Sequence, residues 1–481
     1  MRDRLTLLAA ASIVFGASLG SGFHFDDYAI FSDSAIASPG GWLHLWGLRQ
    51  TRPLTYLTFW INYQLGGASP LGYHILNLVL HLAAVLLAFE CLRRLLPAKA
   101  ALLAAAIFAV HPLQAESVDY IWGRSIVLAA LLCFASLLAW LTRRPWLAIL
   151  CFAAALLAKE ECAAFPLVLI LFLLYPRQTR DLPRQRAPIA AMLLLALAAG
   201  LRVIYAAAVT PGAQASTRAG ISAANYALAQ GVVIFRYLRL LIVPFGFTVD
   251  PEIRVPPLWL GALAWAAILA LAIVAWRRCS LWGLWLIAGF LLLLPSSSIF
   301  PAADLAADRR MYLPLVAFTS AAAVPLLRTR STALCIVIVA ALMAAAIVRT
   351  QVWRSDETLW REAVAESPGK VRPRIQLARS LAPPDALRVL QDARQLAPDD
   401  PGVAAETGRT LLGAGNPAAA LSEFGRALAL DPRNADNYNN RGVALAALGQ
   451  NQAARQDFER ALQLSPGLTS AAENLRKMAA R

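Results

Sequence analysis

The stretch LGYHILNLVLHLAAVLLAFECLRR (residues 71–94) decides the fold of the N-terminal part of the chain. It is apolar over the roughly 20 residues that an α-helix needs to cross the hydrocarbon core of a bilayer. Two arginines, Arg93 and Arg94, close the apolar run. The stretch therefore predicts a membrane-spanning helix with a positively charged end.

Similar apolar runs recur throughout residues 1–350. We interpret the N-terminal run, which ends near Phe23, as an uncleaved first span, and a cleaved signal peptide is the alternative. Residues 225–243 contain Arg236 and Arg239, which are costly at mid-bilayer, so we interpret them as a re-entrant or interfacial segment. About eleven transmembrane helices are expected. The ten runs after the first centre near 71–92, 98–111, 125–142, 145–158, 162–175, 188–208, 258–276, 281–295, 312–327 and 332–349.

The composition supports a membrane protein and excludes other classes. Hydrophobic residues make up 59% of the chain and charged residues 15%, whereas a soluble protein is nearer half apolar and a quarter charged. A soluble globular enzyme and a disordered protein are therefore excluded for most of the chain. Residues 1–350 hold 27 Lys and Arg against 14 Asp and Glu, so the positive excess lies in the apolar part. A nucleic-acid-binding protein would place it on a polar surface, so no nucleic-acid partner is expected.

The charges at the ends of the apolar runs predict the orientation. Basic clusters fall at every second boundary, and the positive-inside rule places them in the cytoplasm. Most of the acids fall at the boundaries between them. An inside N-terminus and eleven crossings put the C-terminal region outside. Because the composition is rich in Ala, Leu and Arg, as in GC-rich bacteria, we expect a multi-pass inner-membrane protein whose C-terminal domain is periplasmic. The basic clusters are Arg2/Arg4, Arg93/Arg94/Lys99, Arg143/Arg144, Arg177/Arg180/Arg184/Arg186, Arg277/Arg278 and Arg328/Arg330.

The region after residue 370 repeats with a period of 34 residues. This is the period of tetratricopeptide repeats, in which pairs of helices stack into a superhelix. The chain therefore divides into a transmembrane domain (1–350) and a tetratricopeptide domain (351–481), and the whole is expected to be all-α. Such repeats bind peptides along their concave face, and a rigid spacer or a dimerisation element is the alternative. The matching pairs are Gly408/Gly442, Gly415/Gly449, Phe424/Phe458, Ala427/Ala461 and Pro432/Pro466.

The loop after the first span contains two adjacent carboxylates among aromatic residues, Asp26 and Asp27. Neighbouring residues in an extended loop point to different sides. One carboxylate can therefore act as a general base on a hydroxyl while the other is held by hydrogen bonds or a cation. Two solvated loop acids are the alternative, because Asp-Asp alone is a weak motif.

Three further segments carry polar residues beside apolar runs. In HPLQAESVDYIWGR (111–124), His111, Glu116 and Arg124 are candidates for lining a pocket, with Arg124 on a phosphate. Lys159-Glu160-Glu161 interrupts two apolar runs, and DRRMY (308–312) has arginines on the expected outer side, where a lipid phosphate is a natural partner. Helix capping, a solvated turn and internal ion pairs are the alternatives. The candidate substrate-binding residues are His111, Glu116, Arg124, Lys159, Glu160, Arg236, Arg309, Arg310 and Tyr312.

The order of these segments resembles that of a known family. The chain is similar to the TMTC-type, protein O-mannosyltransferase-like members of the GT-C glycosyltransferases, which carry C-terminal tetratricopeptide repeats. The resemblance covers nearly the whole chain. Its residues are FHFDDYAI (23–30), RPLTYLTFWINYQLGG (52–67), GYHILNLVLH (72–81), HPLQAESVDYIWGRSIVLAALL (111–132), LLAKEECAAFPLVLI (156–170), RYLRLLIVP (236–244), DRRMYLPL (308–315) and the repeats.

The resemblance implies transfer of a sugar, with mannose as one candidate, from a polyprenyl-phosphate-linked donor. The acceptor is expected to be a hydroxyl, in the first place Ser or Thr of a protein bound by the repeats, on the outer face of the membrane. Asp26 is the expected base, with Asp27 beside it. The donor phosphate would be held by Arg124, Lys159, Arg236, Arg309 and Arg310. The scheme requires no cofactor, and a divalent metal at Asp26 and Asp27 is left open.

Two other functions compete with a transferase. A transporter or flippase of a lipid-linked sugar would need polar residues inside the spans, where we find chiefly Asn77, His81, Glu90 and Arg202. A non-catalytic anchor for a repeat scaffold would need only one span. The sequence favours the transferase over both.

Overall fold

The computed structural model describes the chain except for residues 33, 176–184, 210–220, 299–301, 303 and 480–481. All regular structure in the described part is helical, which confirms the all-α class. The chain divides into two compact units, Met1–Ser355 and Asp356–Arg481. We call them the membrane unit and the repeat unit.

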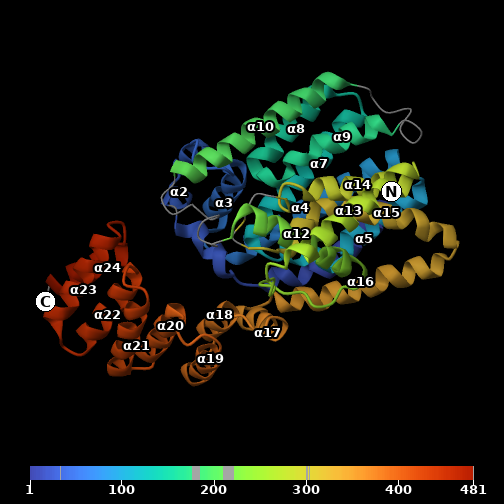
Figure 1. The fold of residues 1–481 in the computed structure, drawn as a ribbon. Coiled ribbons are helices and arrows are strands. Elements are labelled where there is room, and N and C mark those ends of the chain that lie inside the picture. Colours follow the sequence, from blue (N-terminus) through green and yellow to red (C-terminus); the bar gives the residue numbers. More distant parts are fainter. Residues whose placement is uncertain (33, 176–184, 210–220, 299–301, 303, 480–481) are drawn as a thin grey trace. The chain divides into compact units, whose positions relative to one another are not determined.

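The membrane unit is built from long helices that follow the predicted apolar runs (Figure 1). Short 3-10 segments connect them at the polar boundaries, and four of these matter below: η2 (Phe25–Ser32), η5 (Ile121–Gly123), η6 (Glu160–Ala164) and η7 (Asp308–Met311). The main helices are α1 (Arg2–Phe15), α3 (Pro53–Gly66), α4 (Pro70–Leu95), α5 (Ala98–Val110), α6 (Ala115–Val118), α7 (Arg124–Leu141), α8 (Pro145–Ala158), α9 (Phe165–Leu174), α10 (Arg186–Val209), α12 (Ala223–Ile242), α13 (Leu258–Arg277), α14 (Leu281–Leu293), α15 (Tyr312–Leu326) and α16 (Thr332–Val352).

Seven helical segments of the described chain are long and apolar enough to cross a membrane. An eighth candidate is the bent pair Ala98–Val110 and Pro112–Val118, whose halves meet at 52°. α8 and α14 are apolar but shorter, and α9 has only 10 residues. All eleven predicted runs therefore form helices, while the number of crossings stays a prediction. The seven segments are Arg2–Gly20, Pro70–Leu95, Ile121–Leu141, Arg186–Val209, Leu258–Arg277, Asp308–Thr329 and Thr332–Val352.

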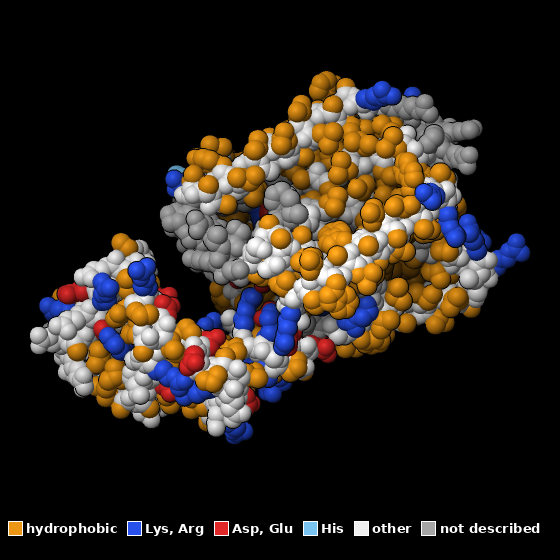
Figure 2. Space-filling view, in the orientation of Figure 1, with side chains coloured by type: hydrophobic (Ala, Val, Ile, Leu, Met, Phe, Trp, Pro, Cys, Tyr) orange, Lys and Arg blue, Asp and Glu red, His pale blue; other side chains and the backbone are white. Residues whose placement is uncertain are grey.

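The outer helices of the membrane unit carry large apolar side chains on their exposed faces. Leu194 and Leu201 on α10 are 68% and 58% exposed, and Leu258 and Trp259 on α13 are 72% and 67% exposed. Figure 2 shows these helices within a broad apolar surface. Apolar patches of this extent are rare on soluble monomers, so this surface fits contact with lipid tails.

The segment predicted as re-entrant forms one continuous helix, α12. It packs closely on α13, where a Cβ added to Gly231 would lie 3.1 Å from both the Ala264 Cβ and the Trp265 ring. α12 is not among the seven apolar segments. Whether it crosses the bilayer stays a prediction.

The repeat unit consists of stacked antiparallel helices, as the 34-residue period predicts. A Cβ added to Gly408 would lie 2.7 Å from the Phe424 ring, and Gly442 stands in the same relation to Phe458. Glycine is therefore required at both of these matching positions, where the paired helices meet. The helices are α17 (Asp356–Glu366), α18 (Arg372–Ser380), α19 (Pro383–Leu396), α20 (Pro401–Gly413), α21 (Pro417–Leu430), α22 (Ala435–Ala447), α23 (Asn451–Leu464) and α24 (Thr469–Ala479).

Candidate active site

Four polar segments that are far apart in the sequence meet at one end of the membrane unit. The η2 loop contacts the 111–124 segment through the Asp27 carboxylate, which accepts the backbone N–H of Trp122 at 2.8 Å. The 111–124 segment contacts η7 through Glu116 and Arg309. η7 and η6 meet at a pocket that both help to line. These are the segments that the charge pattern assigns to one side of the membrane.

The other end of the membrane unit carries a different charge cluster. The Glu90 carboxylate, near the end of α4, forms an ion pair with Arg4 of α1 at 2.7 Å. It also pairs with Arg93 and Arg94 of its own helix, at 3.2 and 3.4 Å. Three arginines surround one carboxylate, so this end keeps a positive excess. Glu90 therefore pairs with the basic clusters and does not form a polar site within the span.

Asp26 and Asp27 differ in their surroundings. The Asp27 carboxylate is fully buried and accepts two backbone N–H groups, from His24 at 2.9 Å and from Trp122 at 2.8 Å. Burial raises the pKa of Asp27 to about 7, although the two N–H donors act in the opposite direction. Asp26 is exposed. Asp27 thus fixes the loop, and Asp26 is the carboxylate that a substrate can reach.

Three buried or half-buried ion pairs join the segments of this end. Glu116 on α6 accepts both the guanidinium and the backbone N–H of Arg309. Arg236 on α12 forms a two-point contact with Asp308. A third pair joins Arg52, before α3, to Glu160 in η6 at 2.6 and 3.1 Å. In a low-dielectric surrounding, such pairs are costly to break because each leaves an uncompensated charge.

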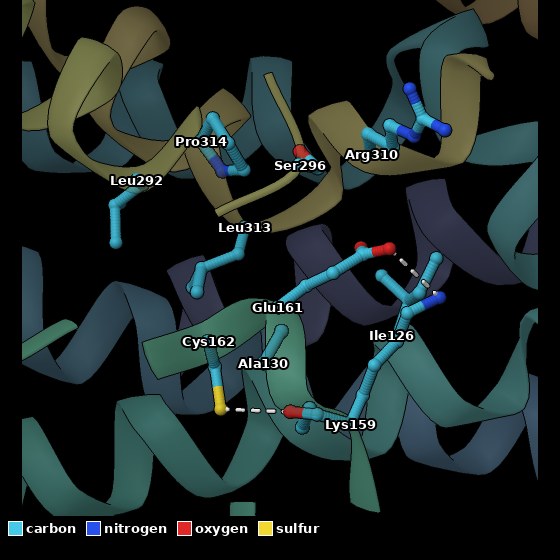
Figure 3. A pocket seen from close by; sticks show the side chains of 11 residues that line it. Ile126, Ala130, Lys159, Glu161, Cys162, Leu292, Ser296, Arg310, Leu313 and Pro314 are labelled. Atoms are coloured by element: carbon cyan, nitrogen blue, oxygen red, sulfur yellow. Dashed lines mark hydrogen bonds and ion pairs between the residues drawn. The ribbon is translucent and has the colours of Figure 1, made fainter. Parts of the chain in front are cut away.

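A pocket between η6, α7, α14 and η7 has a charged side and an apolar side (Figure 3). Lys159 Nζ lies 3.4 Å from the Glu161 carboxylate. The acceptors that the described residues give Arg310 are neutral: the backbone oxygens of Asp304 and Leu305 and the hydroxyl of Tyr226. Two cations therefore line the pocket with one carboxylate. The apolar side is formed by Ile126, Ala129, Ala130, Leu292, Leu313 and Pro314.

The pocket is narrow, and its electrostatics favour an anion. The free space is about 20 Å³, which is room for about one water molecule. A phosphate would enter only after the Glu161 side chain moves away from Lys159. Burial lowers the pKa of the Lys159 ammonium to about 8, against the opposing effect of Glu161. A bound anion would restore the charge balance and stabilise the ammonium form.

The structure places three of the candidate substrate-binding residues in the helix packing, outside the pocket lining. Arg124 is fully buried and donates to Asn77, Asn62 and the Tyr73 carbonyl at 2.6–2.8 Å. The His111 ring contacts the Leu241 carbonyl at 3.1 Å, and the Tyr312 hydroxyl contacts His81 at 2.7 Å. These residues hold helices together, so we leave His111, Arg124 and Tyr312 out of the donor site.

Two features of this end are not evident from the sequence. Arg52 lies within the quoted segment 52–67, but only the fold shows that it pairs with Glu160 across 108 residues. Trp353, at the end of α16, is fully buried, and its carbonyl contacts the ring of His24. The only signals that the sequence offers are an arginine before a proline at a helix start and a lone tryptophan after an apolar run.

Comparison with known proteins identifies both parts of the chain. Residues 50–205 match the family described as dolichyl-phosphate-mannose-protein mannosyltransferase, and residues 405–469 match tetratricopeptide repeats. The family resemblance is confirmed. Residues 50–205 are thus similar to a mannosyltransferase family, and residues 405–469 to tetratricopeptide repeats.

Two relatives of the chain are named protein O-mannosyl-transferases. Tmtc2 of Drosophila melanogaster is 30% identical over 317 residues, which are 56% of this chain and 33% of that protein. F38B6.6 of Caenorhabditis elegans is 24% identical over 421 residues, which are 79% of this chain and 60% of that protein. The chain thus spans about a third of the length of Tmtc2 and about three-fifths of the length of F38B6.6.

The comparison with solved structures includes ArnT from Cupriavidus metallidurans among its matches. ArnT from Cupriavidus metallidurans bound to undecaprenyl phosphate has 15% sequence identity, with a TM-score of 0.39. The likeness covers 90% of this chain and 80% of ArnT.

Proposed function

We propose that this protein is a GT-C-type membrane glycosyltransferase that transfers a sugar, with mannose as the first candidate, from a polyprenyl-phosphate carrier to a hydroxyl. The observation that carries the proposal is a pocket with two cations on one side and leucines on the other, at the same end of the membrane unit as Asp26. Such a pocket suits a lipid phosphate, because the cations neutralise the phosphate charge while the apolar residues contact the hydrocarbon chain, which stays in the bilayer. The mannosyltransferase match over residues 50–205 supports the reaction class.

The reaction assigns separate roles to Asp26 and to the two cations of the pocket. Asp26 accepts the proton of the acceptor hydroxyl as its oxygen bonds to C1 of the sugar. The bond between C1 and the phosphate oxygen breaks, and its electron pair stays on the phosphate. Lys159 and Arg310 neutralise the charge that develops there. Since no covalent nucleophile takes part, the configuration at C1 inverts.

The residues around Asp26 do not form a metal site that fits. The described chain contains no group of three or more His, Cys, Asp or Glu side chains that could hold an ion. Each oxygen of Asp27 accepts one backbone N–H group, and its carboxylate is fully buried, whereas Asp26 is exposed. No step of the proposed reaction passes through a metal.

The repeat unit supplies a surface for a protein acceptor. A groove with a volume of about 610 Å³ is lined mainly by charged and amide side chains in and just before α18, α20 and α22, together with Ser470 of α24. Asn437 and Asn440 line it, while the start of α22 is capped by Asn434, whose side chain accepts the Asn437 N–H at 3.1 Å. Amides of this kind can pair with the backbone of an extended peptide. We propose that this groove binds the acceptor polypeptide.

A transfer assay tests the proposed function directly. Membranes containing the full chain are incubated with radiolabelled polyprenyl-phosphate mannose, and label is measured in protein and in glycolipid. The proposal expects label in protein with the wild type and none above background with Asp26→Asn. Carrier-linked sugar that moves across vesicles without transfer would support a flippase instead. Equal labelling by both chains would remove Asp26 from the mechanism.

A further inference from the structure

Trp353 lies near the C-terminal end of the membrane unit, just before the chain continues into the repeat unit. It follows α16 and lies three residues before Asp356, where the repeat unit begins. Its side chain is fully buried although it stands at the end of an otherwise lipid-exposed helix. A large aromatic side chain at such a position is held by specific neighbours, and here they include Tyr120 of the 111–124 segment and His24 of the loop that bears Asp26.

A continuous aromatic stack runs from Trp353 to the residue before Asp26. The Trp353 ring stacks on Tyr120, with centroids 5.6 Å apart and planes at 26°. Tyr120 stacks on Phe25, with centroids 4.7 Å apart and planes at 23°. Offset stacking of this kind stabilises an aromatic pair beyond the effect of its buried area. The stack therefore fixes the backbone on the N-terminal side of Asp26.

A second contact fixes the backbone around Asp27. The Trp353 carbonyl lies 2.7 Å from Nε2 of the His24 ring. The backbone N–H of the same histidine donates to the Asp27 carboxylate at 2.9 Å. Both neighbours of Asp26 are thus connected to one tryptophan. Arg349, one turn earlier on α16, lies 5.9 Å from the Trp353 ring centroid and adds a cation–π contact.

The loop needs such support because of its own structure. η2 is a run of 3-10 helix, a conformation with poor hydrogen-bond geometry that is rarely stable over many residues. Asp26 itself is exposed, so contacts of its own side chain contribute little to its position. A misplacement of about 1 Å can cost on the order of 100-fold in rate.

We propose that Trp353 is a positioning residue that holds Asp26 in its reactive place. The inference rests on the proposed function of Asp26, and it deepens that function by connecting the catalytic loop to the point where the repeat unit is attached. Removal of the Trp353 ring is expected to release η2 without removing any group that contacts the substrate.

Matched tryptophan variants of the full chain in lipid nanodiscs test this inference. Trp353→Leu is expected to lower kcat about tenfold, with the KM for polyprenyl-phosphate mannose unchanged within about twofold. Trp353→Phe is expected to keep the wild-type kcat, because the aromatic stack remains and Trp353 Nε1 has no hydrogen-bond partner among the described residues. Trp140→Leu is the control, because Trp140 is also fully buried and likewise lacks a partner for Nε1 within the described chain, but lies on α7.

Hydrogen exchange provides a readout that does not require activity. The backbone of residues 23–31 is expected to exchange at least about threefold faster in Trp353→Leu than in the wild type, Trp353→Phe or Trp140→Leu. Failure of the proposed function would appear as a wild type without transfer and would leave this result unchanged. Unaltered exchange in Trp353→Leu, or an equal loss of kcat in Trp140→Leu, would overturn the inference. If Trp353→Leu does not fold, Phe25→Leu removes the other end of the same stack and must give the same changes.

Discussion

The membrane unit and the repeat unit use their charged side chains in different ways. In the membrane unit, the pair Arg309–Glu116 joins residues 193 positions apart, and the Glu116 side chain is only 3% exposed. In the repeat unit, Arg394 pairs with Glu423, 29 positions away, and the two side chains are 32% and 18% exposed. The first kind of pair connects distant segments in a low dielectric. The second connects neighbouring helices in partial contact with water. In these two pairs, the charges connect distant segments in the membrane unit and neighbouring helices in the repeat unit.

The largest expected effect concerns Asp26, because it is the exposed one of the two carboxylates in η2 and the proposed base. Loss of a general base costs about 10²–10⁴-fold in rate, so Asp26→Asn is expected to lower kcat by at least about 100-fold. The side chain is exposed, so the substitution is expected to leave thermal stability unchanged. Steady-state transfer and thermal unfolding measure the two quantities.

A control variant removes an exposed acid from the opposite end of the membrane unit. Asp3 lies in the first turn of α1 and is exposed. Asp3→Asn is expected to keep wild-type kcat. A loss of stability in Asp26→Asn comparable to its loss of rate would indicate a structural role for Asp26.

The second prediction compares one ion pair from each unit. Glu116→Gln leaves Arg309 without its buried carboxylate and is expected to destabilise the membrane unit by about 3–5 kcal/mol. Glu423→Gln is expected to cost less than about 1 kcal/mol, as is usual for partly solvated pairs. Thermal unfolding of the two variants beside the wild type measures the difference. Equal costs would show that the contrast between the two units is wrong.

The third prediction concerns the pH dependence of donor binding. The pKa of Lys159 is lowered to about 8, so its ammonium is lost as the pH rises through this value. The KM for the polyprenyl-phosphate donor is therefore expected to increase between pH 7.5 and 9, by up to about tenfold, which is the effect of a lost charge-assisted contact of about 1.4 kcal/mol. Lys159→Arg keeps its charge over this range and is expected to show a flat profile. An equal rise in both chains would assign the titration to another group.

The smallest expected effect lies in the groove of the repeat unit. Asn440→Ala removes one half-buried amide that lines the groove. One neutral hydrogen bond contributes about 0.5–1.5 kcal/mol, so the KM for a protein acceptor is expected to rise about two- to tenfold, with the donor KM unchanged. Gln450→Ala, outside the lining of this groove, serves as the control. An unchanged acceptor KM would direct the search for the acceptor site to the membrane unit.

The sequence predicts features that depend on local pattern and fails where tertiary contacts decide. Every apolar run became a helix, and the 34-residue period placed Gly408 and Gly442 against their phenylalanines. Arg124 shows the other case. A cation at the start of a helix suggests a phosphate site, but the fold brings Asn77 and Asn62 to it from 47 and 62 residues away. No spacing rule contains that information.

The accessibility of single cysteines in intact cells tests the central claim most directly, because the donor must meet Asp26 on the non-cytoplasmic face. In a chain without its native cysteines, Asp26→Cys and Gln450→Cys report on the catalytic loop and the repeat unit, and Arg328→Cys reports on the basic end. The account predicts that a membrane-impermeant maleimide labels the first two at once and the third only after permeabilisation. Labelling of Asp26→Cys or Gln450→Cys only after permeabilisation would contradict it.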